Sequence, residues 1–203
     1  MKGARLLSRA EMDLVEMTSQ AERPWEQGVS RGVHVTPEFT EATNGHLLVR
    51  LPKPDADPND YPTIEGTEPD APDDVILPVE ALKGWKIPKA NTIPILAYLR
   101  LTSHNGAVDL ASTDLETARV NRVQPIEGEF PKIDRVIPKD RKPAFAFSPK
   151  ALKLIVSWAI KHGVKSLTFH PAEHPDLDSM LITGMLEDGR EATIVLMPVR
   201  LPT

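Results

Sequence analysis

The stretch Glu41–Pro52, EATNGHLLVRLP, poses the question that decides the fold. Asn44-Gly45 predicts a tight turn or bulge, because both residues tolerate a positive φ, and the residues that follow alternate like a strand. A hairpin explains the shape of this corner, but it does not explain why a histidine and a row of leucines occupy it. We therefore interpret the corner as one wall of a docking groove whose other walls come from two distant parts of the chain.

The composition indicates a globular protein and excludes several classes of function. The chain has 203 residues, 40% of them hydrophobic, which suffices for one large domain or two small ones. No apolar run approaches the ~20 residues of a membrane-spanning helix and the N-terminus turns charged early, so we expect a cytoplasmic protein without a secretory signal. The absence of cysteine excludes disulfides, thiol catalysis and zinc–thiolate sites. The net charge of -5 argues against an all-basic surface, but it allows one basic face.

A similar helical pattern begins three times along the chain. Helix starts are predicted around residues 8, 78 and 148, which are 70 residues apart. Proline at the second and third starts suits the first helical position, and Ser148 is a good N-cap. A short apolar run precedes each helix, namely Ala4–Leu7, Val75–Leu77 and Ala144–Phe147.

Strand-like stretches follow each of these helices. They are predicted at residues 32–36, 97–102, 167–170, 180–186 and 192–199. Each repeat also carries a turn pair: Asn44-Gly45, Asn105-Gly106 and Asp188-Gly189. The sequence therefore predicts one module, made of a strand, a helix and further strands, that is used three times.

An acidic, proline-rich stretch, Lys53–Asp74, separates the first two modules. It is almost devoid of apolar residues, so we expect it to be a flexible linker that buries little surface. Its carboxylates could be interpreted as a metal site, but they show no EF-hand spacing and no glycine hinge, which favours a solvated acidic loop.

The third helix carries the clearest charge pattern. Lys150, Lys153, Ser157 and Lys161 fall on one stripe at helical spacing. The opposite side is predicted to be apolar and to pack on a sheet; it comprises Leu152, Ile155, Val156, Ala159 and Ile160. The lysines suit either ordinary solvated surface or contacts with phosphates, which are independent of sequence and sensitive to salt.

The other two helices carry weaker patterns. Lys83 and Lys86 flank Trp85 near the second helix, and Lys89 lies just beyond it. The exposed stripe of the first helix is slightly acidic and comprises Arg9, Asp13, Glu16 and Gln20.

No catalytic motif is present. His170 and His174 lie four residues apart with Glu173 between them, but Pro171 and Pro175 make a helix there unfavourable, which argues against a zinc pair. The chain has no glycine-rich phosphate loop, no G-x-S-x-G elbow and no H-E-x-x-H motif. We expect a protein that is not an enzyme and needs no cofactor.

Three segments together resemble the bacterial DNA polymerase III β subunit, the sliding clamp. They are ATNGHLL at residues 42–48, GEFPKIDRVIP at 128–138 and VLMPVRL at 195–201. The family has approximately A-T-D-G-H-R-L, D-G-x-F-P-x-Y-x-R-V-I/L-P and V-x-M-P-M/V-R-L at these places. Three such segments in the right order, with helices between them, form a fairly specific signal that covers residues 1 to 201.

The resemblance implies an α+β fold of repeated units that place helices on one face of antiparallel sheets. In clamps the three segments converge on a hydrophobic pocket that receives short peptides of polymerases and other replication proteins. Methionine and branched aliphatic residues offer an adaptable apolar surface for such peptides. Carried over to this chain, the pocket would comprise Thr43, Gly45, His46, Leu48, Pro131, Arg135, Val136, Val195, Met197, Pro198, Val199 and Arg200.

The resemblance also implies duplex DNA as a partner, because clamp helices line a central hole through which DNA passes. The residues expected to contact the DNA backbone are Lys83, Lys86, Lys89, Lys150, Lys153 and Lys161. The chain departs from the family in Asn44 and Leu47, which replace the family's Asp and Arg, and in the weakly acidic first helix.

The chain is also much shorter than a clamp subunit, which has three domains of two modules each. Residues 1–138 resemble one clamp domain of two modules, and residues 139–203 resemble a half-domain of one. A clamp ring contains about twelve modules, so we expect a homo-oligomer, and four copies could close a ring by repeated contacts. The alternative is a clamp-derived peptide-binding module that recruits or sequesters replication proteins without encircling DNA.

Overall fold

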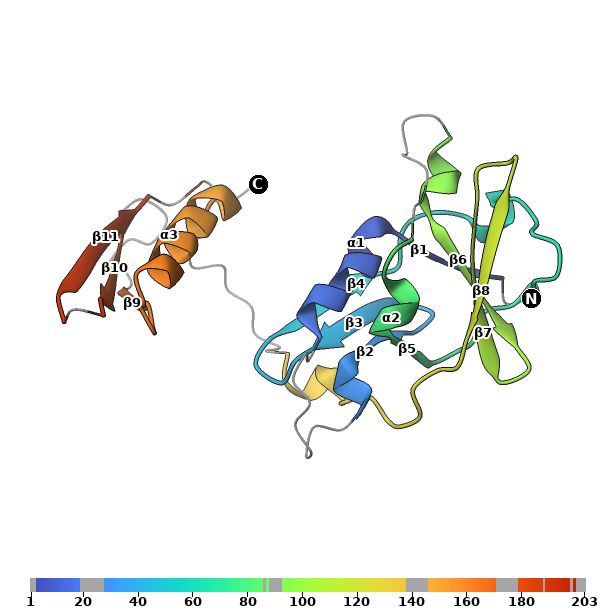
Figure 1. Ribbon diagram of the computed structural model, residues 1–203, viewed down its shortest axis with the longest axis horizontal. Coiled ribbons are helices and arrows are strands. Elements are labelled where there is room, and N and C mark those ends of the chain that lie inside the picture. Colours follow the sequence, from blue (N-terminus) through green and yellow to red (C-terminus); the bar gives the residue numbers. More distant parts are fainter. Residues whose placement is uncertain are drawn as a thin grey trace. The chain divides into compact units, whose positions relative to one another are not determined.

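The computed structural model divides into two units, Met1–Lys132 (unit 1) and Ile133–Thr203 (unit 2). The predicted boundary was between residues 138 and 139. The structure describes residues 3–18, 28–85, 87, 93–137, 146–170, 179–187, 189–197 and 199. Each unit combines antiparallel strands with helices, as the sequence predicted (Figure 1).

Unit 1 contains two modules that exchange their first strands. One sheet has the order β1 (Arg5–Leu7), β6 (Leu99–His104), β7 (Ala107–Thr113), β8 (Ala118–Val123). The other has the order β4 (Leu48–Pro52), β3 (Phe39–Thr43), β2 (Gly32–Val35), β5 (Val75–Pro78). Strand β1 leads into the first module's helix but pairs with β6 of the second module, while β5 leads into the second module's helix but pairs with β2 of the first. Each sheet therefore contains strands from both modules.

The helices of unit 1 are short. Helix α1 (Arg9–Met12) continues into the 3₁₀ helix η1 (Asp13–Met17), and α2 is Val79–Leu82. Further 3₁₀ turns are η2 (Gly28–Arg31), η3 (Pro58–Asp60) and η4 (Pro94–Ala97). One continuous core joins the two modules, and its buried members come from strands and helices of both: Leu7, Met12, Leu14, Val33, Val35, Ala42, Val75, Leu77, Ala81, Leu82, Trp85, Leu99, Leu101, Val108 and Leu110.

A buried ionic network holds the start of α1 to both sheets. Ser8 caps the helix in a capping box. Its hydroxyl accepts a hydrogen bond from the Glu11 amide, and the Glu11 carboxylate accepts one from the Ser8 amide. Glu11 is 1% exposed; its carboxylate pairs with Arg5 of β1 at 2.7 Å and accepts a hydrogen bond from the Thr40 hydroxyl of β3 at 2.6 Å. Arg5 also donates to Thr40 at 3.0 Å, so the network links the two sheets.

Unit 2 contains a single module. Helix α3 (Pro149–Lys161) packs on a three-stranded sheet in the order β11 (Glu191–Leu196), β10 (Met180–Met185), β9 (Thr168–His170), and η5 (Ile133–Arg135) precedes it in the chain. The main hydrophobic cluster among its described residues has three buried members, Met180, Ile182 and Leu196. Partly buried residues surround them: Phe147, Ala151, Leu152, Ile155, Leu167 and Ile194.

The predicted element positions are largely confirmed. Helices begin at Arg9, Val79 and Pro149, and Ser148 occupies the N-cap of α3, although its side chain makes no capping hydrogen bond. Strands β2, β9 and β10 match the predicted ranges closely, whereas β6 begins at Leu99 and β11 ends at Leu196. Of the apolar runs, Ala4–Leu7 and Val75–Leu77 include strand residues, while Ala144 lies outside the described residues.

The prediction that Lys53–Asp74 is a flexible linker was wrong. Tyr61 and Ile64 are 5% and 4% exposed and pack in a second cluster with Leu6 and Ala111. Arg100 also ties the stretch down, because its guanidinium donates to the Thr67 hydroxyl at 2.6 Å and to a backbone carbonyl at 3.1 Å. Backbone hydrogen bonds from the Ser103 amide to the Asp70 carbonyl and from the Ala71 amide to the Gly3 carbonyl add to these contacts, so the stretch packs on unit 1 although its composition predicts a solvated segment.

The apolar side predicted for α3 was partly wrong. Ala159 is buried and Leu152 and Ile155 are partly buried, as expected, but Val156 is 44% exposed and Ile160 is 73% exposed. The helix lies on a small sheet that covers only a narrow face of it. The apolar residues at the edges of the predicted stripe therefore remain open to solvent.

Candidate peptide- and DNA-binding surfaces

The corner between β3 and β4 is held by hydrogen bonds from side chains to the backbone. The Asn44 side-chain oxygen accepts from the amides of His46 and Leu47, at 3.0 Å each. The Thr43 hydroxyl donates to the Leu47 carbonyl at 2.7 Å and accepts from the Gly45 amide at 3.1 Å. Gly45 has a φ of 84°, which explains the glycine. The turn presents His46 and Leu47 on the exposed surface, while Thr43 is buried and Leu48 half-buried.

The same corner recurs 70 residues later, between β7 and β8. Asp114 accepts from the amides of Glu116 and Thr117, at 3.1 and 2.7 Å, and the Thr113 hydroxyl donates to the Thr117 carbonyl at 2.8 Å. Leu115 takes the place of Gly45 and has a φ of 78°. This corner was not predicted, because its sequence has neither an Asn-Gly nor an Asp-Gly pair. The repeated Thr-Asx dipeptide at the 70-residue spacing would have found it.

Phe130 anchors the segment that follows β8. Its ring stacks on that of His34, with centroids 4.4 Å apart. His34 also bonds Glu41 at 3.0 Å and Asp74 at 2.9 Å. Burial alone lowers the pKa of His34, but the hydrogen bonds to Glu41 and Asp74 outweigh it, so the pKa is raised. This cluster fixes Phe130 in unit 1 and leaves the adjacent Pro131 exposed.

In unit 2 the predicted peptide-binding residues form an exposed apolar row. Val195, Met197 and Val199 are 62%, 64% and 44% exposed and alternate with the buried Leu196. The Val199 amide donates to the Ala146 carbonyl at 2.8 Å, which ties the residues after β11 to those before α3.

The remaining predicted residues are described only in part. Arg135 and Val136 are exposed, Val136 to 70%. Pro198 and Arg200 lie outside the described residues. The structure thus groups Thr43, Gly45, His46 and Leu48 at one corner, and the Val195 row within unit 2. Their convergence on one pocket stays a prediction, because the two groups belong to different units.

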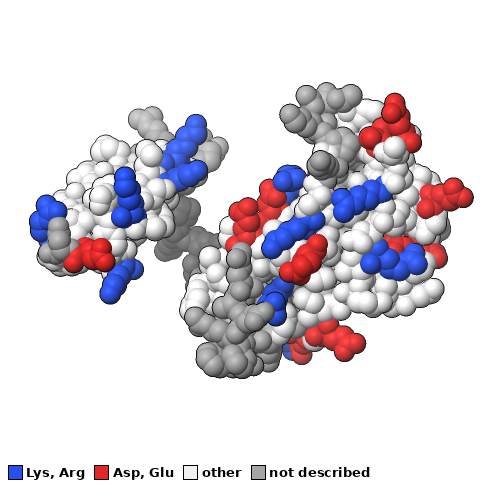
Figure 2. All heavy atoms as spheres, in the orientation of Figure 1, with Lys and Arg blue, Asp and Glu red and all other residues white. Residues whose placement is uncertain are grey.

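The lysines predicted to contact DNA are exposed where the structure describes them. Lys150, Lys153 and Lys161 lie on the solvent side of α3, and Lys83 follows α2. Lys86 and Lys89 are outside the described residues. On the face seen in Figure 2, unit 2 carries several separate basic patches and little acid, whereas acid and base alternate on unit 1. In the first helix, Arg9 pairs with Asp13 at 3.2 Å, which offsets its charge.

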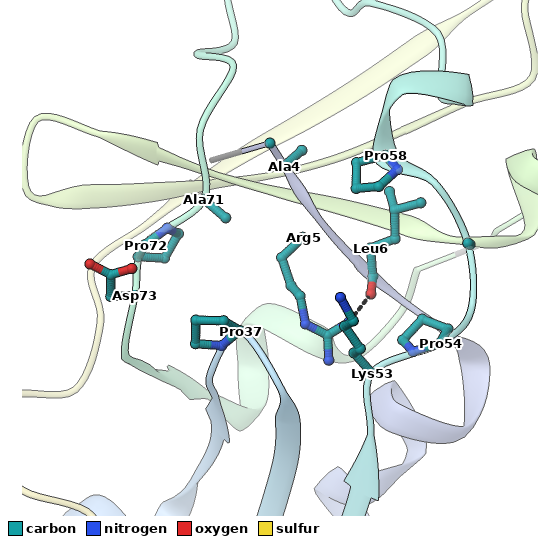
Figure 3. Close-up of a pocket in the computed structure, with 12 residues that line it drawn as sticks. Ala4, Arg5, Leu6, Pro37, Lys53, Pro54, Pro58, Ala71, Pro72 and Asp73 are labelled. Atoms are coloured by element: carbon teal, nitrogen blue, oxygen red, sulfur yellow. Dashed lines mark hydrogen bonds between the residues drawn. The ribbon is translucent and has the colours of Figure 1, made fainter. Parts of the chain in front are cut away.

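A cavity of about 260 Å³ lies elsewhere in unit 1 (Figure 3). Its walls are formed by residues of β1, by Pro37 and by the acidic stretch, including Pro54, Pro58 and Pro72. The charged group of Arg5 is engaged by the Leu6 carbonyl, Glu11 and Thr40. None of the predicted peptide- or DNA-binding residues lines this cavity, so it is a separate feature.

The histidines considered as a metal pair are not brought together by the described structure. His170 is exposed and lies 3.0 Å from the Thr183 hydroxyl, while His174 is outside the described residues. Within the described ranges, no group of three His, Asp or Glu side chains could hold a metal ion. No helix in the same ranges is long and apolar enough to span a membrane.

Comparison with solved structures identifies the fold. The β chain of DNA polymerase III from Streptococcus pneumoniae TIGR4 matches with a TM-score of 0.63 and 15% identity, over 98% of this chain and 50% of that one. The β subunit from Streptococcus pyogenes matches with a TM-score of 0.63 and 13% identity, over 98% of this chain and 51% of that one.

A β sliding clamp from Caulobacter crescentus was solved with polyethylene glycol in a proposed β-motif tethering region. It matches with a TM-score of 0.58 and 16% identity, over 96% of this chain and 50% of that one. The sequence matches no protein-family model and no curated protein. This chain therefore has the fold of the bacterial DNA polymerase III β subunit, the sliding clamp, and spans about half the length of those structures.

Proposed function

We propose that this protein is a clamp-like processivity factor that associates with duplex DNA in the cytoplasm and docks peptide motifs of DNA polymerase or other replication proteins. The observation that carries the proposal is the match of nearly the whole chain to sliding clamps. Since the chain spans half a clamp subunit, several copies would assemble to surround DNA, and four copies would supply the twelve modules of a clamp ring.

The DNA contact rests on the exposed lysines of α3. Lys150, Lys153 and Lys161 share one side of a 13-residue helix and are exposed. Lysines without interleaved aromatic residues bind phosphates as point charges, so binding is independent of base sequence and weakens with salt. A protein that moves along DNA requires this kind of contact.

The peptide contact rests on the two exposed groups described above. His46 and Leu47 stand on a corner fixed by four side-chain hydrogen bonds, and Val195, Met197 and Val199 offer a row of apolar surface. A rigid corner and an adaptable methionine-containing strip are the parts that a short linear peptide needs for docking. The polyethylene glycol in the tethering region of the Caulobacter clamp is consistent with such a surface in that protein.

Charge reversal on α3 tests the DNA contact. The triple variant Lys150→Glu, Lys153→Glu and Lys161→Glu should lose retention on circular DNA, and the slope of log affinity against log salt should fall by about 0.9 for each phosphate that is no longer neutralised. The matched control reverses three exposed lysines outside the stripe, Lys53, Lys132 and Lys165. Equal loss in both triple variants would show that only net charge matters and that α3 does not face the duplex.

Truncation in the C-terminal row tests the peptide contact. Met197→Ala together with Pro198→Ala should abolish binding of a clamp-motif peptide, measured by fluorescence anisotropy, while the circular dichroism spectrum stays unchanged. Met185→Ala is the matched control, because Met185 is 54% exposed in the same unit but outside the predicted pocket. If the double variant binds the peptide as tightly as the natural protein does, Met197 and Pro198 do not belong to a peptide-binding pocket.

One observation favours the alternative of a peptide-binding module that does not encircle DNA. The first helix presents no free positive face, since Arg9 pairs with Asp13 and Glu16 is exposed beside them. Retention on circular but not on linearised DNA supports the clamp. A protein that binds the peptide and is retained on neither DNA supports the module.

A further inference from the structure

The two Asn-Gly pairs of the chain, Asn44-Gly45 and Asn105-Gly106, lie in different turns of unit 1. An asparagine that is followed by glycine is chemically labile, because glycine has no side chain to hinder attack of its amide nitrogen on the asparagine side chain. The attack needs an amide nitrogen that is not engaged elsewhere and a carboxamide that can turn toward it. The fold therefore decides which of the two pairs can react.

The corner around Asn44 opposes this attack. The Asn44 side-chain oxygen accepts from the amides of His46 and Leu47, at 3.0 Å each, so the carboxamide is held in the turn. The Gly45 amide, whose nitrogen would have to attack, donates to the Thr43 hydroxyl at 3.1 Å. A reaction at Asn44 would break all three of these hydrogen bonds.

The pair Asn105-Gly106 forms the two-residue turn between β6 and β7 and is open to the attack. His104 pairs with Ala107 across this turn, so the Gly106 amide lies outside the strand ladder. Both turn residues are exposed, and within the described ranges no hydrogen bond holds the Asn105 side chain. Neither reacting group has to be released from another contact.

The backbone of this turn also suits the cyclic product. Asn105 and Gly106 have φ values of 46° and 83°, as in a type I′ turn. Ring closure fixes ψ of residue 105, so the peptide plane between the two residues must turn over. A type II′ turn closes the same hairpin with a positive φ at the first central residue and a negative φ at the second, and glycine accepts either sign. The ring can therefore form without separating β6 from β7.

We propose that Asn105 is a site of spontaneous deamidation in the folded protein and that the corner around Asn44 protects Asn44 from the same reaction. The Gly106 amide nitrogen bonds to the side-chain carbonyl carbon of Asn105, and the bond from that carbon to the side-chain NH₂ group breaks. Ammonia leaves with the proton of the Gly106 amide. Water then opens the cyclic imide at either of its two carbonyl groups, which leaves aspartate or isoaspartate.

The two products affect the β6–β7 hairpin differently. Asp-Gly favours the same type I′ turn as Asn-Gly, so the aspartate product adds a negative charge and keeps the hairpin. Isoaspartate routes the backbone through the side-chain carbon, which adds a methylene group to the chain and no longer fits a two-residue turn. The protein therefore acquires both a charged form and a damaged form of this hairpin as it ages.

Peptide mapping of the full-length natural chain tests the proposal, because trypsin releases the two pairs separately. Cleavage after arginine gives residues 32–50 and 101–119, and each peptide contains one Asn and no Gln. Folded chain and chain unfolded in urea are incubated in mildly alkaline buffer, and samples are digested at intervals. Chromatography with mass spectrometry follows the conversion, because replacing NH₂ by OH raises the peptide mass and the isoaspartate peptide elutes separately.

In urea we expect both pairs to convert at similar rates. In the folded chain Asn105 should convert faster than Asn44 by about tenfold or more, since breaking one hydrogen bond already accounts for about that factor. Equal rates in the folded chain would overturn the proposal. So would an Asn105 that converts in urea but stays intact in the folded chain.

Two variants of similar shape test whether the corner protects Asn44. Thr43→Val removes the hydroxyl that accepts from the Gly45 amide, so Asn44 should convert roughly threefold faster or more while Asn105 is unchanged. The matched control is Thr113→Val, which removes the equivalent hydroxyl from the corner between β7 and β8 and should change neither rate. If Thr43→Val leaves Asn44 as slow as in the natural chain, the proposed protection is wrong.

Discussion

Units 1 and 2 are built from the same module, yet they bury it very differently. Unit 1 joins two modules by strand exchange around one core of fifteen buried residues. Unit 2 has one module, and the hydrophobic cluster of its described residues has three buried members. Of the fifteen large apolar side chains exposed in the described ranges, only Leu47, Ile93, Leu115 and Val120 belong to unit 1. The module thus supplies only half of a core, and a second module completes it.

The largest expected loss of stability comes from breaking the buried ionic network of unit 1. Glu11→Ala removes the carboxylate that neutralises buried Arg5 and bonds Thr40, so it should destabilise unit 1 by about 3–5 kcal/mol. Urea unfolding followed by hydrogen exchange in each unit measures this loss, and unit 2 should be unaffected. Glu16→Ala, at an exposed position of η1, is the control and should change stability by less than about 0.5 kcal/mol. Similar losses in both variants would contradict the network's role.

Two helix leucines, one buried and one exposed, give the next largest effect and can break the comparison. Leu82→Ala in α2 removes a side chain that is 4% exposed and should cost unit 1 about 3 kcal/mol. Leu154→Ala in α3 removes one that is 74% exposed and should cost almost nothing in dilute solution. The same hydrogen-exchange measurement compares the two. If Leu154→Ala is as harmful as Leu82→Ala at low concentration, α3 is already covered within one chain.

The smallest effect compares the two repeated corners of unit 1. Gly45→Leu places a branched residue at φ 84°, where no atom lies within 4 Å of the new Cβ, so backbone strain alone should destabilise the protein by about 1 kcal/mol. Leu115→Gly relieves the same strain and should stabilise it by roughly 0.5 kcal/mol, since the flexible unfolded glycine offsets part of the gain. Thermal unfolding of both variants checks the opposite signs; two changes of the same sign would show that the corners are not equivalent.

Sequence could predict the repeated module, because its signals are local. The serine or proline at each helix start, the apolar runs and the strand alternation all lie within a few residues of the structure they specify. The 70-residue spacing then indicated the number of modules. The corner at Thr43–Leu48 was predicted for the same reason, since the Asn44-Gly45 pair by itself favours a tight turn with a positive φ at Gly45.

Contacts between distant segments could not be predicted in this way. Nothing near Tyr61 or Ile64 in the sequence indicates that they will find Leu6 and Ala111, and so the acidic stretch looked solvated. The strand exchange between modules and the stacking of Phe130 on His34 are likewise set by tertiary packing. The exposure of Ile160 is different, because at 100° per residue it lies about 20° from Lys153 and about 100° from the buried Ala159, so helical periodicity could have predicted it.

The cluster of His34, Glu41, Asp74 and Phe130 has a consequence for the response of unit 1 to acidity. Because the pKa of His34 is raised above its ordinary value of 6.5 in the folded state, protonation of His34 contributes stability that is fully present below that value and is lost as the pH rises through the raised pKa. The pKa of Glu41 is lowered by its hydrogen bonds to His34 and Arg50, which outweigh its burial, so its contribution is lost only in stronger acid. The segment that contains Phe130 should therefore be held most firmly in mildly acidic solution.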